Sequence, residues 1–233
     1  MNPANRLAAL VRVDMLKGLA KPDLEAVAAM CRWRGYEKDQ QVIEQDGGSQ
    51  DVYFVARGRV RITIYAVNGR EVTFRDLAAG ASFGELSAVD GRTRSTSVVA
   101  LEDTWLASLS REQFRKALRS YPLVVDNVLN GLVGLIRNLT ERVVEYSTLG
   151  VRNRIQAELV RMARERGVAN NRATLSPAPK HADIAARVST NREEVTREFG
   201  HLTREGIVKK GTGELVIVDV ARLIDMVDKV REQ

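Results

Sequence analysis

The segment "KHADIAARVSTNREEVTREFGHLTREGIVKKGTGELVIVD", residues 180–219, combines two helical patterns with the pattern of a β-hairpin. Ile184 and Val188 lie about one turn apart and give the first helix an apolar side. A stripe spaced by four and then three residues marks the second helix: Val195, Phe199 and Leu202. The part "VKKGTGELVIV" is typical of two strands joined at a glycine-rich tip. The segment therefore predicts a helix-turn-helix with a hairpin wing.

The second of these helices has a polar face opposite its apolar stripe, concentrated in its first two turns. Asn191, with Glu194 three residues later, predicts a capping box at its start. In a helix-turn-helix this N-terminal part enters the major groove, and a wing typically touches phosphates. An ordinary helical subdomain with a solvated charged face is the alternative. We predict these DNA-binding residues: Lys180, Asn191, Arg192, Glu193, Thr196, Arg197, Lys209 and Lys210.

A different period begins after Pro122, where the spacing of apolar residues alternates between four and three. This heptad seam contains Val125, Leu129, Leu132, Ile136, Leu139, Val143 and Tyr146. Three heptads predict a helix of ~40 Å, packed against a second helix. Because such a seam is narrower than the stripe that a globular core requires, we expect a parallel homodimer. The alternative is that the helix packs on its own barrel.

Residues 41–107 show the period-two alternation of short β-strands: "QVIEQ", "DVYFVAR", "GRVRITIYAVNGREVTFRDL" and "STSVVALEDTWLASLS". The pair Asn68-Gly69 predicts a type I′ hairpin turn, because both central residues of that turn need positive φ. Short strands at this density predict a small β-sandwich or jelly-roll barrel. Helical patterns flank the strands, "NRLAALVRVDMLKGL" before them and "REQFRKALRSY" after them.

Within this region, "FGELSAVDGRTRSTS", residues 83–97, places an acid directly after a glycine and an arginine nine residues later. A β-sandwich, a dimerising helix and a winged helix-turn-helix in this order resemble the cyclic-AMP receptor protein (CRP/FNR) family of bacterial transcription regulators. In that family a phosphate-binding cassette lies between two barrel strands. Eight residues match its pattern in order: Phe83, Gly84, Glu85, Leu86, Ser87, Arg94, Ser95 and Thr96.

The resemblance covers nearly the entire chain and implies an α+β fold in three parts. These are a cyclic-nucleotide-binding β jelly roll at 1–121, a dimerisation helix at 122–149 and a winged helix-turn-helix at 150–233. It also implies a homodimer that binds double-stranded DNA and works with RNA polymerase. Two positions depart from the family pattern: Lys180 stands where a threonine is common, and Ser189 replaces the usual turn glycine. A non-glycine residue at positive φ has a real cost.

The chemistry of a cyclic nucleotide explains the residue types of the cassette. Glu85 can accept a hydrogen bond from the ribose 2′-hydroxyl, and Arg94 offers a charged donor fork to the phosphate oxygens. Ser95 and nearby backbone N–H groups add donors. An exposed ion pair on a loop is the alternative. In relatives, polar residues of the long helix read the base, and the matching residues here are Asn138 and Thr140. Because Thr140 suits an adenine amino group and Ser95 could equally help a guanine, cyclic AMP and cyclic GMP both stay open.

Composition narrows the functional class. The 233 residues are 44% hydrophobic with a net charge of +6, and residues 152–210 hold 13 Lys/Arg against 7 Asp/Glu, which suggests a polyanionic partner. A single cysteine, Cys31, excludes an internal disulfide and favours a reducing compartment, so we expect a cytoplasmic protein. We expect the Cys31 side chain itself to be a small buried hydrophobic residue. His181 and His201 have no further ligand at metal-binding spacing, and we expect no metal. No stretch reaches membrane-spanning length.

We therefore expect a homodimeric transcription factor without catalytic activity that a cyclic nucleotide activates. Arginine fits the O6 and N7 acceptors of guanine and glutamate accepts from the cytosine amino group, which favours an operator close to TGTGA-N6-TCACA. One alternative keeps this architecture with another effector, such as a cyclic dinucleotide, or with none. A remote alternative is a phosphodiesterase-like enzyme that uses Glu85 and Arg94, although the sequence shows no metal cluster or nucleophile pair for it.

Overall fold

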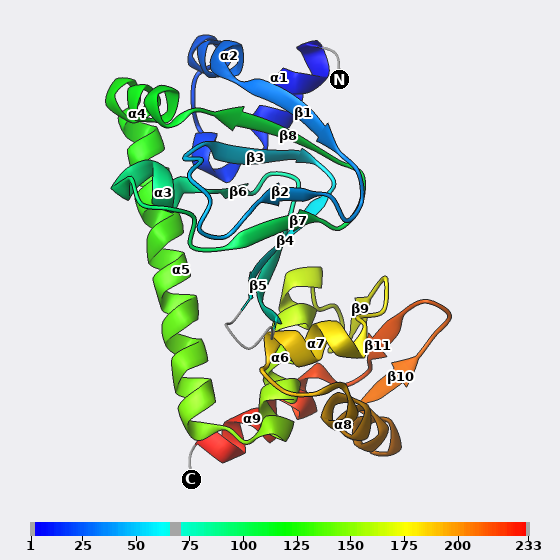
Figure 1. Cartoon of the computed structure of the whole chain (residues 1–233). Coiled ribbons are helices and arrows are strands. Elements are labelled where there is room, and N and C mark those ends of the chain that lie inside the picture. Colours follow the sequence, from blue (N-terminus) through cyan, green and yellow to red (C-terminus); the bar gives the residue numbers. More distant parts are fainter. Residues whose placement is uncertain (1–2, 66–70, 232–233) are drawn as a thin grey trace. The chain divides into compact units, whose positions relative to one another are not determined.

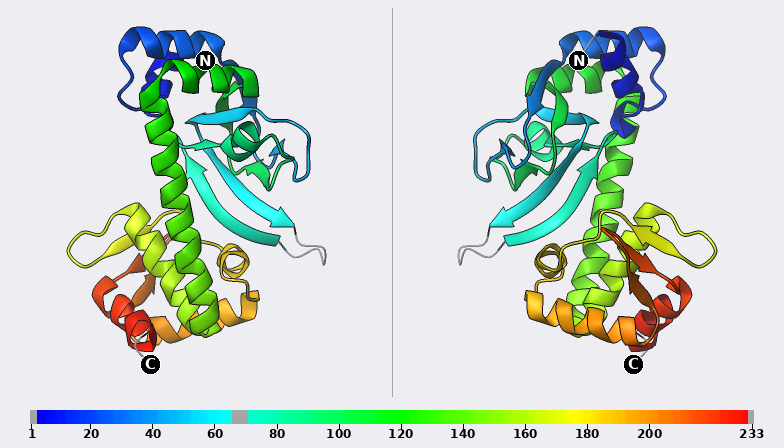
Figure 2. Two further views of the ribbon diagram at one scale, coloured as in Figure 1. Left: turned by 90° about the vertical axis from the view of Figure 1, so that its left-hand side faces the viewer. Right: turned by 90° about the vertical axis from the view of Figure 1, so that its right-hand side faces the viewer.

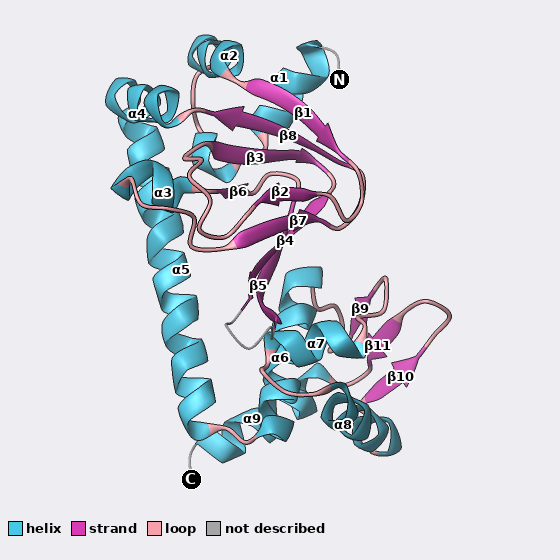
Figure 3. Ribbon diagram, in the orientation of Figure 1, coloured by secondary structure: helices cyan, strands magenta, loops and turns pink. Residues whose placement is uncertain are grey.

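The computed structural model describes residues 3–65 and 71–231, and the chain divides into two compact units, residues 1–136 and 137–233. Figure 1 shows the elements in chain order. The first unit is built around β-strands and the second mainly from helices (Figure 3). The boundary between the units falls inside the long helix α5, Pro122–Thr148, and the three-part division at 121/122 and 149/150 stays a prediction.

Two four-stranded antiparallel sheets form the described part of the first unit's sandwich. The first sheet has the order β1 Arg32–Tyr36, β8 Thr104–Leu109, β3 Val52–Arg57 and β6 Ser82–Phe83. The second has the order β2 Gln41–Ile43, β7 Ser97–Ala100, β4 Arg59–Tyr65 and β5 Glu71–Ala78. Apolar residues of both sheets share one core: Val55, Val60, Ile62, Phe83, Val98 and Leu106. This arrangement confirms the β-sandwich that the alternating pattern predicts.

Helices gather at one end of this sandwich (Figure 2). They are α1 Pro3–Val11, the 3-10 turn η1 Asp14–Leu16, α2 Lys21–Met30 and α4 Arg111–Ser120. Their apolar sides and strand β3 build a second core cluster: Leu10, Leu16, Leu24, Phe54 and Phe114. The first turns of α5 join this cluster through Val124 and Val128.

The lone cysteine, Cys31, stands at the C-terminal cap of α2. Its side chain is half-buried against the helical core cluster, and burial raises the pKa of the thiol to about 12. The expected role as a buried small hydrophobe is therefore met in part, because the side chain packs on the core without being fully enclosed.

Four helices enclose the core of the second unit together with a small sheet. The helices are α6 Val151–Arg166, α7 His181–Arg187, α8 Arg192–Arg204 and α9 Val220–Arg231. The sheet has the order β10 Val208–Lys210, β11 Leu215–Ile217 and β9 Ala173–Leu175. The two apolar stripes seen in the sequence are buried in this core: Ile184, Val188, Val195, Phe199 and Leu202. The pair α7–α8 with its following hairpin confirms the winged helix-turn-helix.

Several elements differ from the sequence-based expectation. The sequence pattern predicts no strand before the wing in the second unit, but residues 167–179 contain β9, which pairs with β11 and places Ala173 opposite Ile217. A three-residue strand is too short to show an alternating pattern. Strand β1 and helices α2 and α9 also go beyond the expected elements. The turn Asn68-Gly69 lies outside the described residues, although β4 and β5 on its two sides are paired antiparallel.

Candidate functional site

The cassette segment begins where β6 ends and the short helix α3, Glu85–Asp90, starts. Gly84 caps α3 with a φ of 87°, in the left-handed region where a side chain is strained. A Cβ atom at this position would lie 2.7 Å from the carbonyl oxygen of Asp51 and 2.9 Å from Nη1 of Arg94. Only glycine therefore fits between this backbone and the arginine.

Arg94 is the cation of the cassette, and only 3% of the residue is exposed. Its Nη1 donates to Gly84 O at 2.9 Å, and its Nη2 donates to Asp51 O at 2.7 Å and to Ser49 Oγ at 3.2 Å. Its Nε also donates to Ser49 Oγ at 3.2 Å. Burial lowers the pKa of Arg94 below its usual value, yet an arginine stays protonated in a protein. These bonds fix the guanidinium and occupy four of its five N–H groups.

Glu85 is the first residue of α3, and its Oε2 is buried without a hydrogen-bond partner among the described residues. Burial raises the pKa of this carboxyl above its usual value, while a backbone hydrogen bond and the charges of Arg75 and Arg94 act in the opposite direction. A buried acceptor left without a donor costs about 1–3 kcal/mol. Because Arg94 is buried too, the two residues are not an exposed ion pair on a loop.

The other cassette residues differ in their surroundings. Phe83 is buried and stacks on Tyr53, with ring centroids 5.1 Å apart and an interplanar angle of 7°. Ser87 is buried, and its Oγ donates to Thr93 O at 3.2 Å. Phe83 and Ser87 therefore support the cassette from within. Three further members are exposed or half-buried: Leu86, Ser95 and Thr96.

Sequence reasoning did not find Ser49 and Asp51, which hold Arg94 from 45 and 43 residues earlier in the chain. Contacts over such separations leave no periodic signal, although Gly47-Gly48 does mark a turn there. The residues expected to read the base, Asn138 and Thr140, are exposed on α5 in the second compact unit. Their contact with a base stays a prediction.

All eight residues expected to bind DNA are exposed. Asn191 Oδ1 accepts a hydrogen bond from the backbone N–H of Glu194 at 2.9 Å, which is one half of the predicted capping box. The reciprocal bond from the Asn191 N–H to the Glu194 carboxylate is not found among the described residues, so the capping box is met only in part. The Glu194 carboxylate pairs with Arg197, whose Nη2 lies 2.6 Å from Oε1. On β10, Lys209 and Lys210 are exposed on the wing beside α8 (Figure 1).

The hydroxyl of Thr196 is engaged within the helix pair. Its Oγ1 donates to Arg192 O at 2.9 Å and lies 2.8 Å from Nδ1 of His181. The His181 ring also packs on Phe199, with centroids 4.7 Å apart, and burial together with Lys210 and Arg192 lowers the pKa of the imidazole. His181 therefore links α7 to α8. Because the Thr196 hydroxyl is engaged in these contacts, we expect the methyl group of Thr196 to be the part that contacts DNA.

The turn between α7 and α8 has the departure that the sequence indicates. Ser189 adopts a φ of 52°, in the left-handed region where glycine is usual. Lys180 is the N-cap residue of α7, and its side chain makes no capping hydrogen bond.

The heptad seam of α5 is largely exposed. Val125 and Leu132 are half-buried, whereas Leu129 is 54%, Ile136 62% and Val143 64% exposed. Leu139 and Tyr146 are exposed as well. An apolar strip of this length is typical of a surface that a partner covers.

Two family models match the chain: a cyclic nucleotide-binding domain at residues 33–121 and a Crp-like helix-turn-helix domain at residues 153–226. The "Cyclic AMP receptor protein" of Thermus thermophilus is 32% identical over 214 residues, which cover 90% of this chain and 94% of that protein. The chain belongs to the CRP/FNR family of transcription regulators. The family models thus assign the two compact folds to cyclic-nucleotide binding and to DNA binding.

Solved structures show the same CRP/FNR fold. The crystal structure of Thermus thermophilus Catabolite Activator Protein is 30% identical with a TM-score of 0.55, over 93% of this chain and 99% of that chain. The c-di-GMP responsive regulator CLP from Xanthomonas campestris is 19% identical with a TM-score of 0.73, over 85% and 99%. In the described part of the chain, no helix is long and apolar enough to cross a membrane, and no three His, Cys, Asp or Glu side chains are grouped to hold a metal ion.

Proposed function

We propose that this CRP/FNR protein is a homodimeric transcription regulator that cyclic AMP activates. The observation that carries the proposal is Oε2 of Glu85, a buried acceptor without a donor among the described residues, in the same short segment as the buried cation Arg94. One ligand hydroxyl and one ligand phosphate would satisfy both groups. The 32% identical relative is named a cyclic AMP receptor protein, which supports adenine over guanine.

The two charged residues of the cassette bind different groups of the nucleotide. Glu85 accepts a hydrogen bond from the ribose 2′-hydroxyl, which supplies the missing donor. Arg94 attracts the phosphate with a charge that burial leaves poorly screened, and its remaining Nη1 N–H donates to a phosphate oxygen. The exposed Ser95 adds a second donor. Thr140 on α5 is the residue that we expect to bond the adenine amino group.

The exposed seam of α5 pairs with its copy in a second chain, which covers the apolar strip and sets two α8 helices against one operator. Arg192 and Arg197 then read guanine, and Glu193 reads cytosine, in half-sites close to TGTGA. Arg197 must exchange its Glu194 partner for the base. This exchange is inexpensive, because exposed ion pairs contribute only about 0–1 kcal/mol.

Nucleotide binding acts by shifting the population of two states of the dimer, because the ligand prefers the state that binds DNA. Such coupling is reciprocal, so DNA must tighten nucleotide binding by the same factor by which the nucleotide tightens DNA binding.

Calorimetric titration tests the effector. Cyclic AMP, cyclic GMP and cyclic di-GMP are titrated separately into the protein, each with and without operator DNA selected from a random pool. We expect one cyclic AMP per chain, weaker binding of cyclic GMP, no binding of cyclic di-GMP, and tighter cyclic AMP binding when DNA is present. Binding of cyclic di-GMP in place of cyclic AMP would show that the effector is a cyclic dinucleotide. Release of AMP during the incubation would identify a phosphodiesterase.

A further inference from the structure

A single side chain from the end of α5 contacts the last residue of α7 and the turn that follows it in the helix-turn-helix. Tyr146 Oη lies 3.0 Å from Arg187 O and 3.3 Å from Ser189 Oγ. Because a phenol carries one hydrogen, Tyr146 donates to the Arg187 carbonyl and accepts from the Ser189 hydroxyl. The last turns of α5 are therefore bonded directly to the segment that orients α8.

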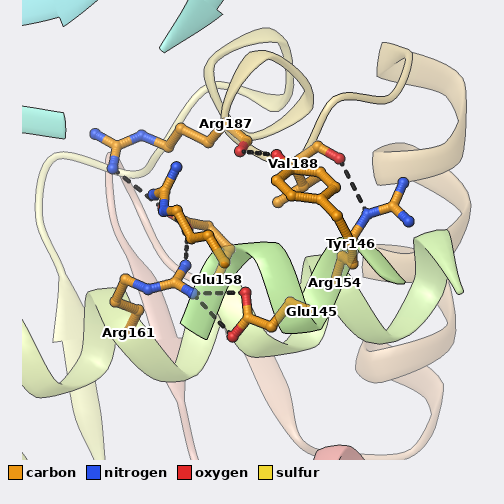
Figure 4. Close-up of a pocket in the computed structure, with 8 residues that line it drawn as sticks. Glu145, Tyr146, Arg154, Glu158, Arg161, Arg187 and Val188 are labelled. Atoms are coloured by element: carbon orange, nitrogen blue, oxygen red, sulfur yellow. Dashed lines mark hydrogen bonds and ion pairs between the residues drawn. The ribbon is translucent and has the colours of Figure 1, made fainter. Parts of the chain in front are cut away.

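The next carbonyl of the turn is held from α6. Arg154 Nε donates to Val188 O at 3.2 Å, and its Nη1 donates to Leu149 O at 3.0 Å. The guanidinium also lies over the Tyr146 ring, 5.1 Å from its centroid, which fixes the phenol from its face (Figure 4). Two successive carbonyls of the turn thus have donors from two different helices.

The side chain of Arg187 holds the same turn to α6. Its Nη1 lies 3.1 Å from Oε1 of Glu158, which is 1% exposed. Arg161 bonds to Glu158, and its Nη2 donates to both carboxylate oxygens of Glu145 at 2.8 and 3.0 Å (Figure 4). Arg142 Nη2 lies 3.6 Å from Oε2 of Glu158. Glu145 precedes Tyr146 on α5, so these ion pairs hold the end of α5, α6 and the start of the turn together.

The turn needs such support because Ser189 has a φ of 52°. A non-glycine residue in the left-handed region is strained and persists only where the surrounding structure enforces it. The bonds from Tyr146 and Arg154 are located at this strained position and at the two residues before it.

We propose that Tyr146 is a positioning residue for DNA recognition, which holds the Arg187–Ser189 turn so that α8 presents its polar face to the operator. The proposal rests on the proposed function, since DNA binding is its readout. Tyr146 also lies in the heptad seam, so this side chain connects the helix expected to dimerise with the turn that precedes the recognition helix.

Tyr146→Phe tests the proposal because it keeps the ring under Arg154 and removes only the hydroxyl. We expect operator affinity of the nucleotide-bound dimer to fall about 5-fold or more, as the loss of one net hydrogen bond in each of two turns allows. Cyclic AMP affinity without DNA and the mass of the dimer should not change. Ser147→Ala is the matched control, because it removes a hydroxyl from the neighbouring residue, and that hydroxyl donates to Val143 O within α5.

Repeating Tyr146→Phe in a protein that carries Ser189→Gly separates a positioning role of Tyr146 from a general effect on stability. Ser189→Gly removes the strain of the turn, so Tyr146→Phe should reduce operator affinity by less than about 2-fold in that background. Hydrogen exchange of the turn amides, which needs no DNA, should be faster in Tyr146→Phe than in the wild type.

Unchanged operator affinity in Tyr146→Phe would overturn the positioning role, and so would an equal loss in the serine and glycine backgrounds. A wild type that binds no DNA would instead remove the proposed function, and the positioning role with it. The two failures are therefore distinguished by the wild-type measurement alone.

Discussion

Glu85→Ala should make the free protein more stable while it weakens nucleotide binding. The substitution removes a buried acceptor that has no donor among the described residues, a defect that costs about 1–3 kcal/mol. It also removes a negative charge from the first turn of α3, which loses about 0.3–1 kcal/mol. The balance is a gain of about 0–2.7 kcal/mol in the free energy of unfolding, with a central value of about 1.4 kcal/mol. For a chain of this size, the central gain raises the thermal midpoint by about 3–6 °C.

Cyclic AMP binding should change in the opposite direction. A hydrogen bond between the ribose hydroxyl and a charged acceptor contributes about 1.5–3 kcal/mol, so affinity should fall by about 10- to 150-fold. The loss should be much smaller for 2′-deoxy cyclic AMP, which lacks the donor. Thermal denaturation without ligand and calorimetry with both nucleotides measure the two effects on the same protein.

The pH dependence of the stability gain gives an independent check. Burial raises the pKa of the Glu85 carboxyl above 4.5, its usual value, so ionisation disfavours the folded state. The penalty is complete above the raised pKa and vanishes below 4.5, where folded and unfolded chains are both protonated. The gain from Glu85→Ala should therefore shrink as the pH falls towards 4.5.

Glu112→Ala is the matched control, because Glu112 is an exposed acid in the first turn of α4. It should lower the thermal midpoint slightly and leave nucleotide affinity unchanged. A Glu85→Ala protein that is less stable than wild type and binds cyclic AMP normally would refute the reasoning. Glu85 Oε2 would then have a partner in solution and would not be the ribose acceptor.

Four further substitutions have expected outcomes. Arg94→Ala should lower cyclic AMP affinity by about 100-fold or more in calorimetry while the dimer stays folded, and near-normal affinity would remove the cassette assignment. Leu139→Asp should give monomers without operator binding, because a carboxylate buried in the seam costs several kcal/mol. A dimer that persists in sedimentation would show that the seam has another role. Glu193→Gln should relax selected operators at one base pair, at a cost of about 1–3 kcal/mol, whereas Lys209→Ala should weaken all DNA alike and flatten the salt dependence. Selection of motifs without a GTGA core would contradict the register of α8.

The sequence was most informative where one local period determines burial. The stripe Val195, Phe199 and Leu202 placed α8, and the same residues are buried in the structure. Short strands are less visible, because three residues such as those of β9 hold too little of a period to separate strand from loop. Strand β9 forms because β11 offers it a pairing edge, which is information from another part of the chain.

The candidate site shows the same division. Gly84, Glu85 and Arg94 lie within eleven residues, so a local pattern could identify them. Ser49 and Asp51 bond to the Arg94 guanidinium from the loop that precedes β3. Neither their residue types nor their spacing distinguishes them from other loop residues. The Tyr146 contact was equally hidden, because the seam pattern accounts for an apolar ring at that position and says nothing about its hydroxyl.

The lone cysteine has a practical consequence for following α8 in solution. Burial raises the thiol pKa of Cys31 to about 12, so very little of it is ionised at neutral pH, and the thiolate is the form that attacks maleimides. A second cysteine placed on the exposed surface of the wing, for example by Thr212→Cys, would react with its ordinary thiol pKa. One fluorophore per chain can therefore be attached beside the recognition helix without first removing the natural thiol, and energy transfer between the two chains of a dimer would report the separation of its wings as nucleotide is added.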